Sequence, residues 1–304
     1  MRIGIDESGD FTRHSAMQDH FSVAIEARSG SLERFRRWES SVGKEQRSGG
    51  EVKGSLLTTE QLACFVNDVL APEPPIRLRP VLLRPTAESP ESVNSSRHAT
   101  ADQLEAEAQA ARAAGDLRAA GEAQQCARWI RALNDSDYLW LNAMSTCVGA
   151  AIYDVFLDSD AGGYSEELRH LKIVVDQRKI RANNVPGKTA AVQAVAWFLQ
   201  VDSAQAFPAM APLLRRMADA HPLAEQWRTL DRKWRVVPLI EAICDFSARS
   251  IDHPAIRIAD VVATIYGRAS RREDSAVRQV RHRCEALVGG SGMSLWVRLA
   301  RTGR

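Results

Sequence analysis

Four acidic residues stand where the elements expected from the sequence begin or end: Asp6, Glu51, Asp176 and Asp260. A carboxylate at a strand end or on a helix that faces a sheet costs free energy unless it is solvated, paired or bound to a metal. Hard divalent cations take oxygen ligands, and two such ions about 3.5–4 Å apart can clamp both oxygens of a phosphoryl displacement. These residue types therefore predict metal-assisted phosphate chemistry, provided that the fold brings them together.

Each carboxylate alone also has a plain structural explanation. Asp6 can cap a turn, Glu51 can be a surface residue, and Asp260 can cap a helix or pair with Arg257. The order of the four along the chain is what favours a common site. If the strands at 1–6 and 170–176 lie side by side, Asp6 and Asp176 converge at one edge of the sheet.

Basic residues follow two of these carboxylates. Lys53, two residues after Glu51, is expected to contact substrate phosphate or to hold a carboxylate in place, and a solvated surface lysine is the alternative. Arg178, Lys179 and Arg181 come just after Asp176, where their donors can follow a phosphate backbone. An ordinary charged loop is the alternative for that run.

Other polar residues near these positions have weaker signals. Asp10 is expected to be a turn residue more than an extra ligand, and Glu7 points to the opposite face from Asp6 if the strand persists. His14, His20 and His253 are near enough in sequence to carry protons, but no spacing requires it.

The elements that must position the four carboxylates follow from hydrophobic periodicity. Residues 2–6 and 21–27 are expected to form a hairpin, and Ser31 to cap a helix over 32–42. Further strands are predicted at 76–83, 170–176 and 239–246, and further helices at 59–71, 102–133, 138–157, 189–199 and 256–270. The Pro-, Ser- and Glu-rich stretch 85–100 is expected to be a loop, and the Ala-rich helix after it to carry little core.

Composition limits the class of protein. The chain has 304 residues with 40 Lys and Arg against 38 Asp and Glu, so its near-neutral charge excludes a protein that coats nucleic acid by charge alone. Charge is nevertheless uneven, because ten arginines and four acidic residues follow position 256. The five cysteines form no CxxC pair, which disfavours a disulfide framework or a zinc ribbon and favours a reducing compartment. The first residues predict a strand and not a signal peptide, and the apolar run 138–157 predicts a buried helix and not a membrane span. We therefore expect a cytoplasmic protein.

The chain resembles a bacterial domain-of-unknown-function family that is marked by an N-terminal Asp-Glu-Ser-Gly-Asp motif and is generally regarded as ribonuclease H-like. The residues that carry the resemblance are Asp6-Glu7-Ser8-Gly9-Asp10, Glu51-x-Lys53-Gly54, Asp176 and Ala259-Asp260. Members often have Gln two residues before the Ala-Asp pair, where this chain has Arg257. The resemblance implies an α/β fold with a ribonuclease H-like mixed sheet flanked by helices. It would form one domain over 1–304, with a helical insertion at 86–160 and a basic helical C-terminal segment at 271–304.

The same resemblance implies a two-metal phosphodiesterase site. Asp6, Glu51, Asp176 and Asp260 would hold Mg²⁺ or Mn²⁺, which would lower the pKa of a bound water and stabilise charge on the scissile phosphate. The leading hypothesis is a metal-dependent nuclease that hydrolyses RNA or DNA, acting alone, as a homo-oligomer or in a larger complex. The alternative is a non-catalytic nucleic-acid-binding or complex-assembly protein on the same fold. A nucleotide phosphotransferase is disfavoured, because no Gly doublet stands in a convincing phosphate-loop setting.

Overall fold

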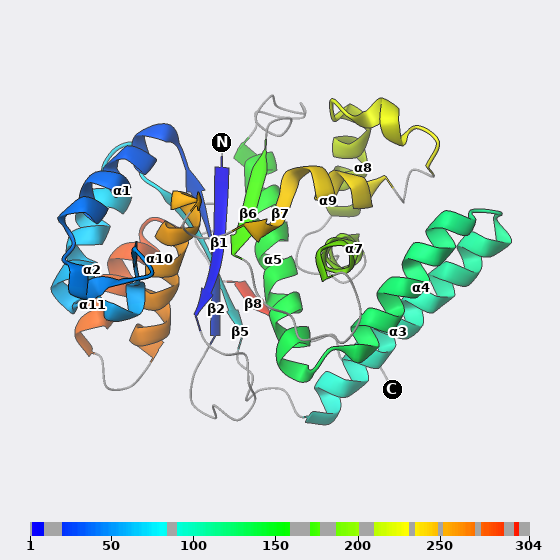
Figure 1. Cartoon of the computed structure of the whole chain (residues 1–304), viewed down its shortest axis with the longest axis horizontal. Coiled ribbons are helices and arrows are strands. Elements are labelled where there is room, and N and C mark those ends of the chain that lie inside the picture. The colour runs from blue at the N-terminus through cyan, green and yellow to red at the C-terminus, as the bar shows by residue number, and fades with distance from the viewer. Residues whose placement is uncertain are drawn as a thin grey trace.

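A six-stranded mixed sheet runs through the middle of the protein in the computed structural model (Figure 1). The structure describes residues 2–8, 20–83, 90–158, 171–176, 187–200, 210–230, 235–248, 252–270, 275–288 and 295–297. The strand order is β7-β6-β1-β2-β5-β8. The bounds are β1 Arg2–Ser8, β2 His20–Ala27, β5 Arg77–Leu83, β6 Lys172–Asp176, β7 Cys244–Ala248 and β8 Leu295–Val297.

Strand β2 runs antiparallel to both of its neighbours, β1 and β5. The pairs β1–β2 and β2–β5 are antiparallel, whereas β1–β6, β6–β7 and β5–β8 are parallel. The predicted hairpin of β1 and β2 is confirmed, with Arg2 opposite Ala27 and Ser8 opposite Phe21. The predicted strand at 170–176 is also confirmed, and it lies directly beside β1.

Alternate residues of β1 serve two separate hydrophobic cores. Ile3 and Ile5 point to one face of the sheet and belong to the core formed there with a layer of helices. These helices are α5 Asp135–Asp158, α7 Gly187–Gln200, α8 Met210–Ala220 and α9 Val236–Ile243. Gly4, Asp6 and Ser8 lie on the other face, because successive side chains of a strand point to opposite sides. That face is covered by α1 Ser29–Ser41, α2 Thr59–Phe65, α10 Pro254–Ser270 and α11 Ser275–Glu285 (Figure 1). The sheet thus separates the α10 side of the molecule from the α5 side.

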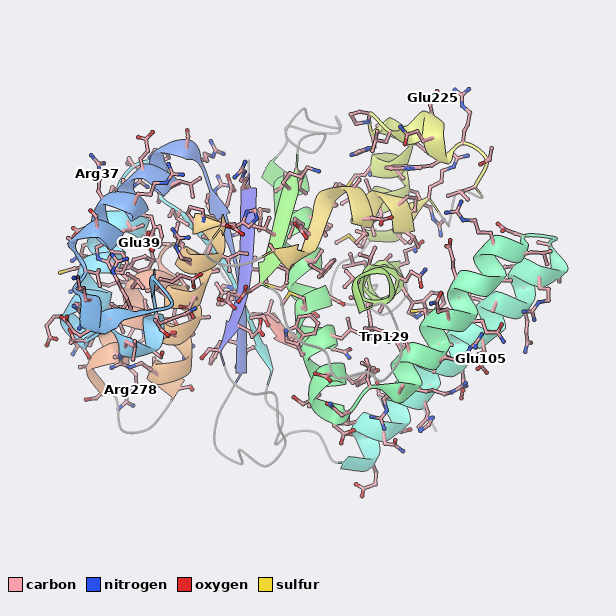
Figure 2. All side chains as sticks on the ribbon, in the orientation of Figure 1. Arg37, Glu39, Glu105, Trp129, Glu225 and Arg278 are labelled. Carbon is pink, nitrogen blue, oxygen red and sulfur yellow. The ribbon has the colours of Figure 1, made fainter. Side chains whose placement is uncertain are left out.

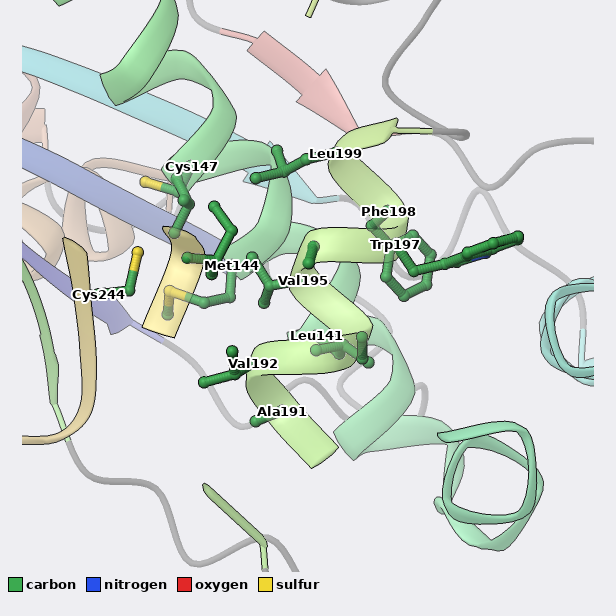
Figure 3. Close-up of a cluster of buried hydrophobic side chains, with 14 of the residues drawn as sticks. Leu141, Met144, Cys147, Ala191, Val192, Val195, Trp197, Phe198, Leu199 and Cys244 are labelled. Carbon is green, nitrogen blue, oxygen red and sulfur yellow. The ribbon is translucent and has the colours of Figure 1, made fainter. Parts of the chain in front are cut away.

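The predicted buried helix at 138–157 is α5, which packs against β1, β2 and β5. Leu141, Met144 and Cys147 of α5 are fully buried, and α5 packs against α7 as well as against the sheet (Figure 3). The Tyr138 hydroxyl is buried as well, and it lies within hydrogen-bond distance of Ser96 and Thr100 at 2.9 and 3.0 Å.

Among the described helices, none has the length and apolar character needed to cross a bilayer.

Two helices replace the single helix and loop expected between 85 and 133. Helix α3 begins at Pro90 and runs to Ala113, so the predicted loop is wrong from residue 90 onward. A proline is well suited to the first turn of a helix, where its missing N–H is not needed. The chain then turns at Gly115, whose φ is +83°, and Asp116 caps α4 Leu117–Ala132. Helices α3 and α4 form an antiparallel arm (Figure 1). The arm contributes more buried side chains to the hydrophobic core than expected, because Trp129 and Ile130 near its base are fully buried (Figure 2).

Three other expectations are corrected. The strand predicted at 239–246 is helix α9 up to Ile243, because Leu239, Ile240 and Ile243 form a helical stripe, and only Cys244–Ala248 is strand. In the predicted helical segment 271–304, Ser275–Glu285 is helix, but Leu295–Val297 is a strand on the sheet edge. Ser31 lies inside α1, where its hydroxyl accepts a hydrogen bond from the N–H of the N-cap residue Arg28.

Candidate carboxylate site

Asp6 and Asp176 lie on neighbouring strands and face α10. Ile5 pairs with Val175 in the parallel β1–β6 ladder, and the two aspartates are the next residues on each strand. Val174, two residues before Asp176, belongs to the core on the α10 side. Asp6 is only 7% exposed, and its Oδ1 accepts a hydrogen bond from the backbone N–H of Glu7 at 2.8 Å. The predicted convergence of these two carboxylates is therefore present in the fold.

Helix α10 brings Asp260 against the same strand. The helix touches β1 closely near both ends, at Gly4 and at Ser8. A Cβ added to Gly4 would lie 2.3 Å from the backbone of Ala255, and one added to Gly267 would lie 2.3 Å from Ser8 Oγ. These small residues allow a close approach of helix and strand. Asp260, between the two contacts, interacts electrostatically with Asp6.

Glu51 comes from a small hairpin on the same side of the sheet. Strands β3 Arg47–Ser48 and β4 Glu51–Val52 are joined by Gly49 and Gly50, whose φ angles are +61° and +87°. Such left-handed conformations suit glycine because it has no Cβ. The hairpin places Glu51 two residues before Lys53 and three before the 3₁₀ turn η2 Gly54–Leu56.

The η2 turn lies along α10 and is held there by hydrogen bonds. The Gly54 N–H donates to Asp260 Oδ2 at 3.1 Å, and Arg268 donates to the Leu57 carbonyl at 2.7 Å. Between these two bonds, a Cβ on Gly54 would lie 2.5 Å from Thr264 Oγ1. The segment that follows Glu51 is therefore fixed directly to the helix that carries Asp260.

Lys53 contacts the acidic cluster. Its Nζ donates to Glu51 Oε2 at 2.8 Å, and the lysine and glutamate side chains are 37% and 11% exposed. Burial alone would lower the pKa of Lys53, but the hydrogen bond to Glu51 and the charges of Glu51, Asp260 and Asp176 raise it overall. Of the two expectations for this residue, a role in holding a carboxylate agrees with this geometry better than a solvated surface position does.

Burial and neighbouring carboxylates raise the pKa values of Asp6 and Asp260. Burial raises the pKa of Asp6 well above its ordinary value, and the charges of Glu7, Asp260 and Asp176 raise it further. Burial also raises the pKa of Asp260, despite the opposing effects of the Gly54 hydrogen bond and of Lys53, and Asp176 and Glu51 add to the rise. A shared site that carries excess negative charge favours either protonation or a bound cation.

All four predicted carboxylates thus belong to one electrostatically connected cluster. Their oxygen donors suit Mg²⁺ or Mn²⁺ more than a soft metal. As the side chains stand, however, no three Asp, Glu, His or Cys side chains in the described ranges are close enough together to hold a metal ion. The donor set therefore fits such a cation, and its coordination would need side-chain rearrangement.

Glu7 points to the face opposite Asp6, as predicted, and its charge adds to the effect of burial in raising the pKa of Cys147 on α5. His253 precedes α10, and its Nδ1 is buried without a hydrogen bond among the described residues. Arg178, Lys179, Arg181, Asp10 and His14, as well as the side chain of His20, lie outside the described residues.

The arginines near the C-terminus are partly engaged within the fold. Arg257 pairs with Glu39 on α1, and Arg268 holds the η2 segment. Arg281 pairs with Glu285 and lies over the rings of Phe21 and Tyr266. The local arginine excess is thus in part structural, whereas Arg278 lies on the outer side of α11 (Figure 2).

Sequence reasoning missed the residue that pairs with Arg257. Glu39 lies 218 positions away on α1, and its own surroundings look like those of an ordinary polar helix face.

In comparisons with known proteins, no family model, curated protein or solved structure matches this chain.

Proposed function

We propose that this protein is a metal-dependent nuclease that hydrolyses RNA or DNA at the carboxylate site. The observation that carries the proposal is the convergence of Asp6, Asp176, Asp260 and Glu51 from four separate elements, with raised pKa values for Asp6 and Asp260. Clustered carboxylates with perturbed pKa values are typical of functional sites. Excess negative charge in a partly buried site is what a divalent cation would neutralise.

Each residue has a role in this proposal. Asp6, Glu51, Asp176 and Asp260 would hold one or two Mg²⁺ or Mn²⁺ ions. The metal, when bound, supplies an activated water and stabilises charge on the phosphate and on the leaving oxygen. Lys53 is already among the carboxylates, where its ammonium can also donate to a phosphate oxygen. The buried position of Asp6 keeps bulk water from one side of the site.

The proposal extends to the fold and to the remaining basic residues. A mixed sheet with carboxylates on adjacent parallel strands β1 and β6 supports the ribonuclease H-like arrangement implied by the Asp-Glu-Ser-Gly-Asp resemblance. Arg178, Lys179 and Arg181 lie within five residues after Asp176, so we assign them to the substrate phosphate backbone. The substrate partner would be nucleic acid, and the cofactor Mg²⁺ or Mn²⁺.

The test uses the full chain with single- and double-stranded RNA and DNA, with and without Mg²⁺ or Mn²⁺. Asp6→Asn and Asp176→Asn should each lower cleavage by about 100-fold or more, since each removes a charged ligand. Asp68→Asn is the control, because it neutralises an exposed carboxylate outside the cluster. Equal cleavage by the wild type and by both aspartate variants would refute the assignment.

The alternative is a non-catalytic nucleic-acid-binding or assembly protein. The observation that favours it is that no three potential ligands in the described chain are positioned for a metal. The α3–α4 arm gives such a protein an extended surface (Figure 1). Calorimetry that detects no divalent-metal binding, together with intact salt-sensitive binding of nucleic acid, would favour this function over the nuclease.

A further inference from the structure

Glu39 and Arg257 form a partly buried ion pair between α1 and α10. Arg257 donates from Nε to Glu39 Oε1 at 2.9 Å and from its terminal nitrogen to Oε2 at 3.0 Å. The two side chains are 11% and 14% exposed, and the guanidinium lies 5.5 Å from the centre of the Phe35 ring. Two parallel hydrogen bonds fix the relative orientation of the two groups as well as their distance. Figure 2 shows Glu39 on the α1 side of the sheet.

The same residue of α1 is joined to the hairpin that carries Glu51. Arg47 on β3 donates to the backbone carbonyl of Glu39, and its other terminal nitrogen donates to the Gly50 carbonyl at 3.2 Å. Gly50 directly precedes Glu51. One guanidinium therefore connects the end of α1 to the turn next to a candidate ligand.

These contacts form a continuous bridge from the hairpin to α10. At one end, Arg47 and Gly50 stand beside Glu51, and at the other, Arg257 lies one helical turn before Asp260. The hydrogen bond from Gly54 to Asp260 joins the segment after Glu51 to α10 directly, as a second connection beside this bridge. We infer that Glu39 is a positioning residue: through Arg47 and Arg257, it sets the position of Glu51 relative to Asp260.

The pairing also explains why this chain carries Arg at position 257. A glutamine would be too short and uncharged to make two charge-assisted bonds to a carboxylate on α1. Removing one partner of such a pair leaves the other charge buried, so the local structure must move to solvate it. The first element to move would be the first turn of α10, since the Glu39 carboxylate holds that turn, whereas the hairpin is held through the Glu39 backbone carbonyl.

The first test needs no metal. The exchange rate of the Gly54 amide hydrogen, measured by NMR on the full chain, reports whether the hairpin segment stays on α10. Glu39→Gln breaks the Arg257 arm of the bridge, and Arg47→Met breaks the other arm. Each variant should speed Gly54 exchange by about tenfold, the effect expected when a charge-assisted bond is lost.

Asp135→Asn is the matched control. It weakens another partly buried ion pair, between Arg97 and Asp135, which are 13% and 27% exposed. That pair joins α3 to α5 on the other side of the sheet, so Gly54 exchange should stay as in the wild type. The paired replacement Glu39→Arg with Arg257→Glu should restore part of the protection. Unchanged Gly54 exchange in both Glu39→Gln and Arg47→Met would overturn the inference, as would an equal increase in Asp135→Asn.

A second test rests on the proposed function and uses Mn²⁺ as the probe. Arg47→Met should weaken Mn²⁺ binding in calorimetry by about five- to tenfold, but have no further effect in a Glu51→Gln background, because no carboxylate remains there to position. An equal effect in both backgrounds would show general destabilisation and contradict positioning. A wild-type chain that binds no Mn²⁺ would refute the metal site and leave the Gly54 exchange result to decide on Glu39.

Discussion

Gly54 donates its backbone N–H to Oδ2 of Asp260 at 3.1 Å, although 206 positions separate the two residues. The bond joins the segment after Glu51 to the helix that covers β1. Glycine is needed at this point, because a Cβ would lie 2.5 Å from Thr264 Oγ1 and 3.1 Å from the Asp260 carbonyl oxygen. The contact therefore depends on both a carboxylate and the absence of a side chain.

Gly54→Ala should push the η2 segment away from α10. We expect the free energy of unfolding to fall by about 1–3 kcal/mol, the usual cost of overpacking. Urea denaturation measures this change. Gly30→Ala is the control, since a Cβ at Gly30 meets nothing within 4 Å and should leave stability nearly unchanged or slightly raised. A Gly54→Ala protein as stable as the wild type would show that the segment is not tightly packed.

Asp6→Asn should stabilise the metal-free protein at neutral pH. The change removes a buried charge from an acidic cluster, while the asparagine carbonyl can still accept the Glu7 N–H. We expect a gain of about 1 kcal/mol in the free energy of unfolding, together with the loss of Mn²⁺ binding. Asp68→Asn, at an exposed acidic residue of the π-helical turn η3 Val66–Leu70, should change stability by less than about 0.5 kcal/mol. Destabilisation by Asp6→Asn would contradict a strained carboxylate cluster.

The stability contributed by Asp6 and Asp260 should fall as pH rises. Their folded-state pKa values are raised above the ordinary value of 3.8, so the native state binds more protons than the unfolded state does. This contribution is fully present below pH 3.8 and is lost as pH rises through the folded-state pKa values. Urea denaturation of wild type and Asp6→Asn between pH 3.5 and pH 7 in the presence of a chelator isolates the effect as a difference curve. If the free energy of unfolding of the wild type instead increased with pH relative to that of Asp6→Asn, the prediction would be wrong.

Lys53→Met should separate metal binding from phosphate binding. Lys53 is more than one third exposed, so its loss should cost less than about 1 kcal/mol of stability. Without the Lys53 ammonium, a divalent cation bound by these carboxylates is repelled less by neighbouring positive charge. The affinity for Mn²⁺ should therefore rise about two- to fivefold. Nucleic-acid binding should weaken, with a shallower dependence on salt. Calorimetry and a salt titration measure the two effects, and weaker Mn²⁺ binding would instead identify Lys53 as a support for Glu51.

The sequence predicted the central strands because their signals are local. Alternation in residues 2–6 and 21–27 defines a hairpin, and the apolar run that ends at Asp176 defines a buried strand. That the strands at 1–6 and 170–176 lie side by side was an assumption, and the parallel pairing of β1 with β6 confirms it. By contrast, Leu239–Phe246 is apolar enough for either structure, and only the packing of α9 against α7 and α8 decides for helix as far as Ile243.

The four candidate carboxylates were all identifiable from the sequence, but their supporting contacts were not. Motif spacing marks Glu51, Lys53 and Gly54, yet nothing near Glu39 indicates a partner on a helix more than 200 residues away. Ion pairs of this kind depend on how α1 and α10 pack, which is a property of the tertiary structure. The same holds for Gly4 and Gly267. These glycines allow α10 and β1 to approach closely, because a Cβ at either position would clash with Ala255 or Ser8.

The arm formed by α3 and α4 offers a practical point of attachment. Its turn, at Gly115 and Asp116, ends in Leu117, whose side chain is 72% exposed, and the arm packs on the α5 side of the sheet. The carboxylates face α10 on the other side. A fluorophore or surface tether joined at this turn would therefore leave the acidic site open to solution, which suits the chain to single-molecule observation on an immobilised surface.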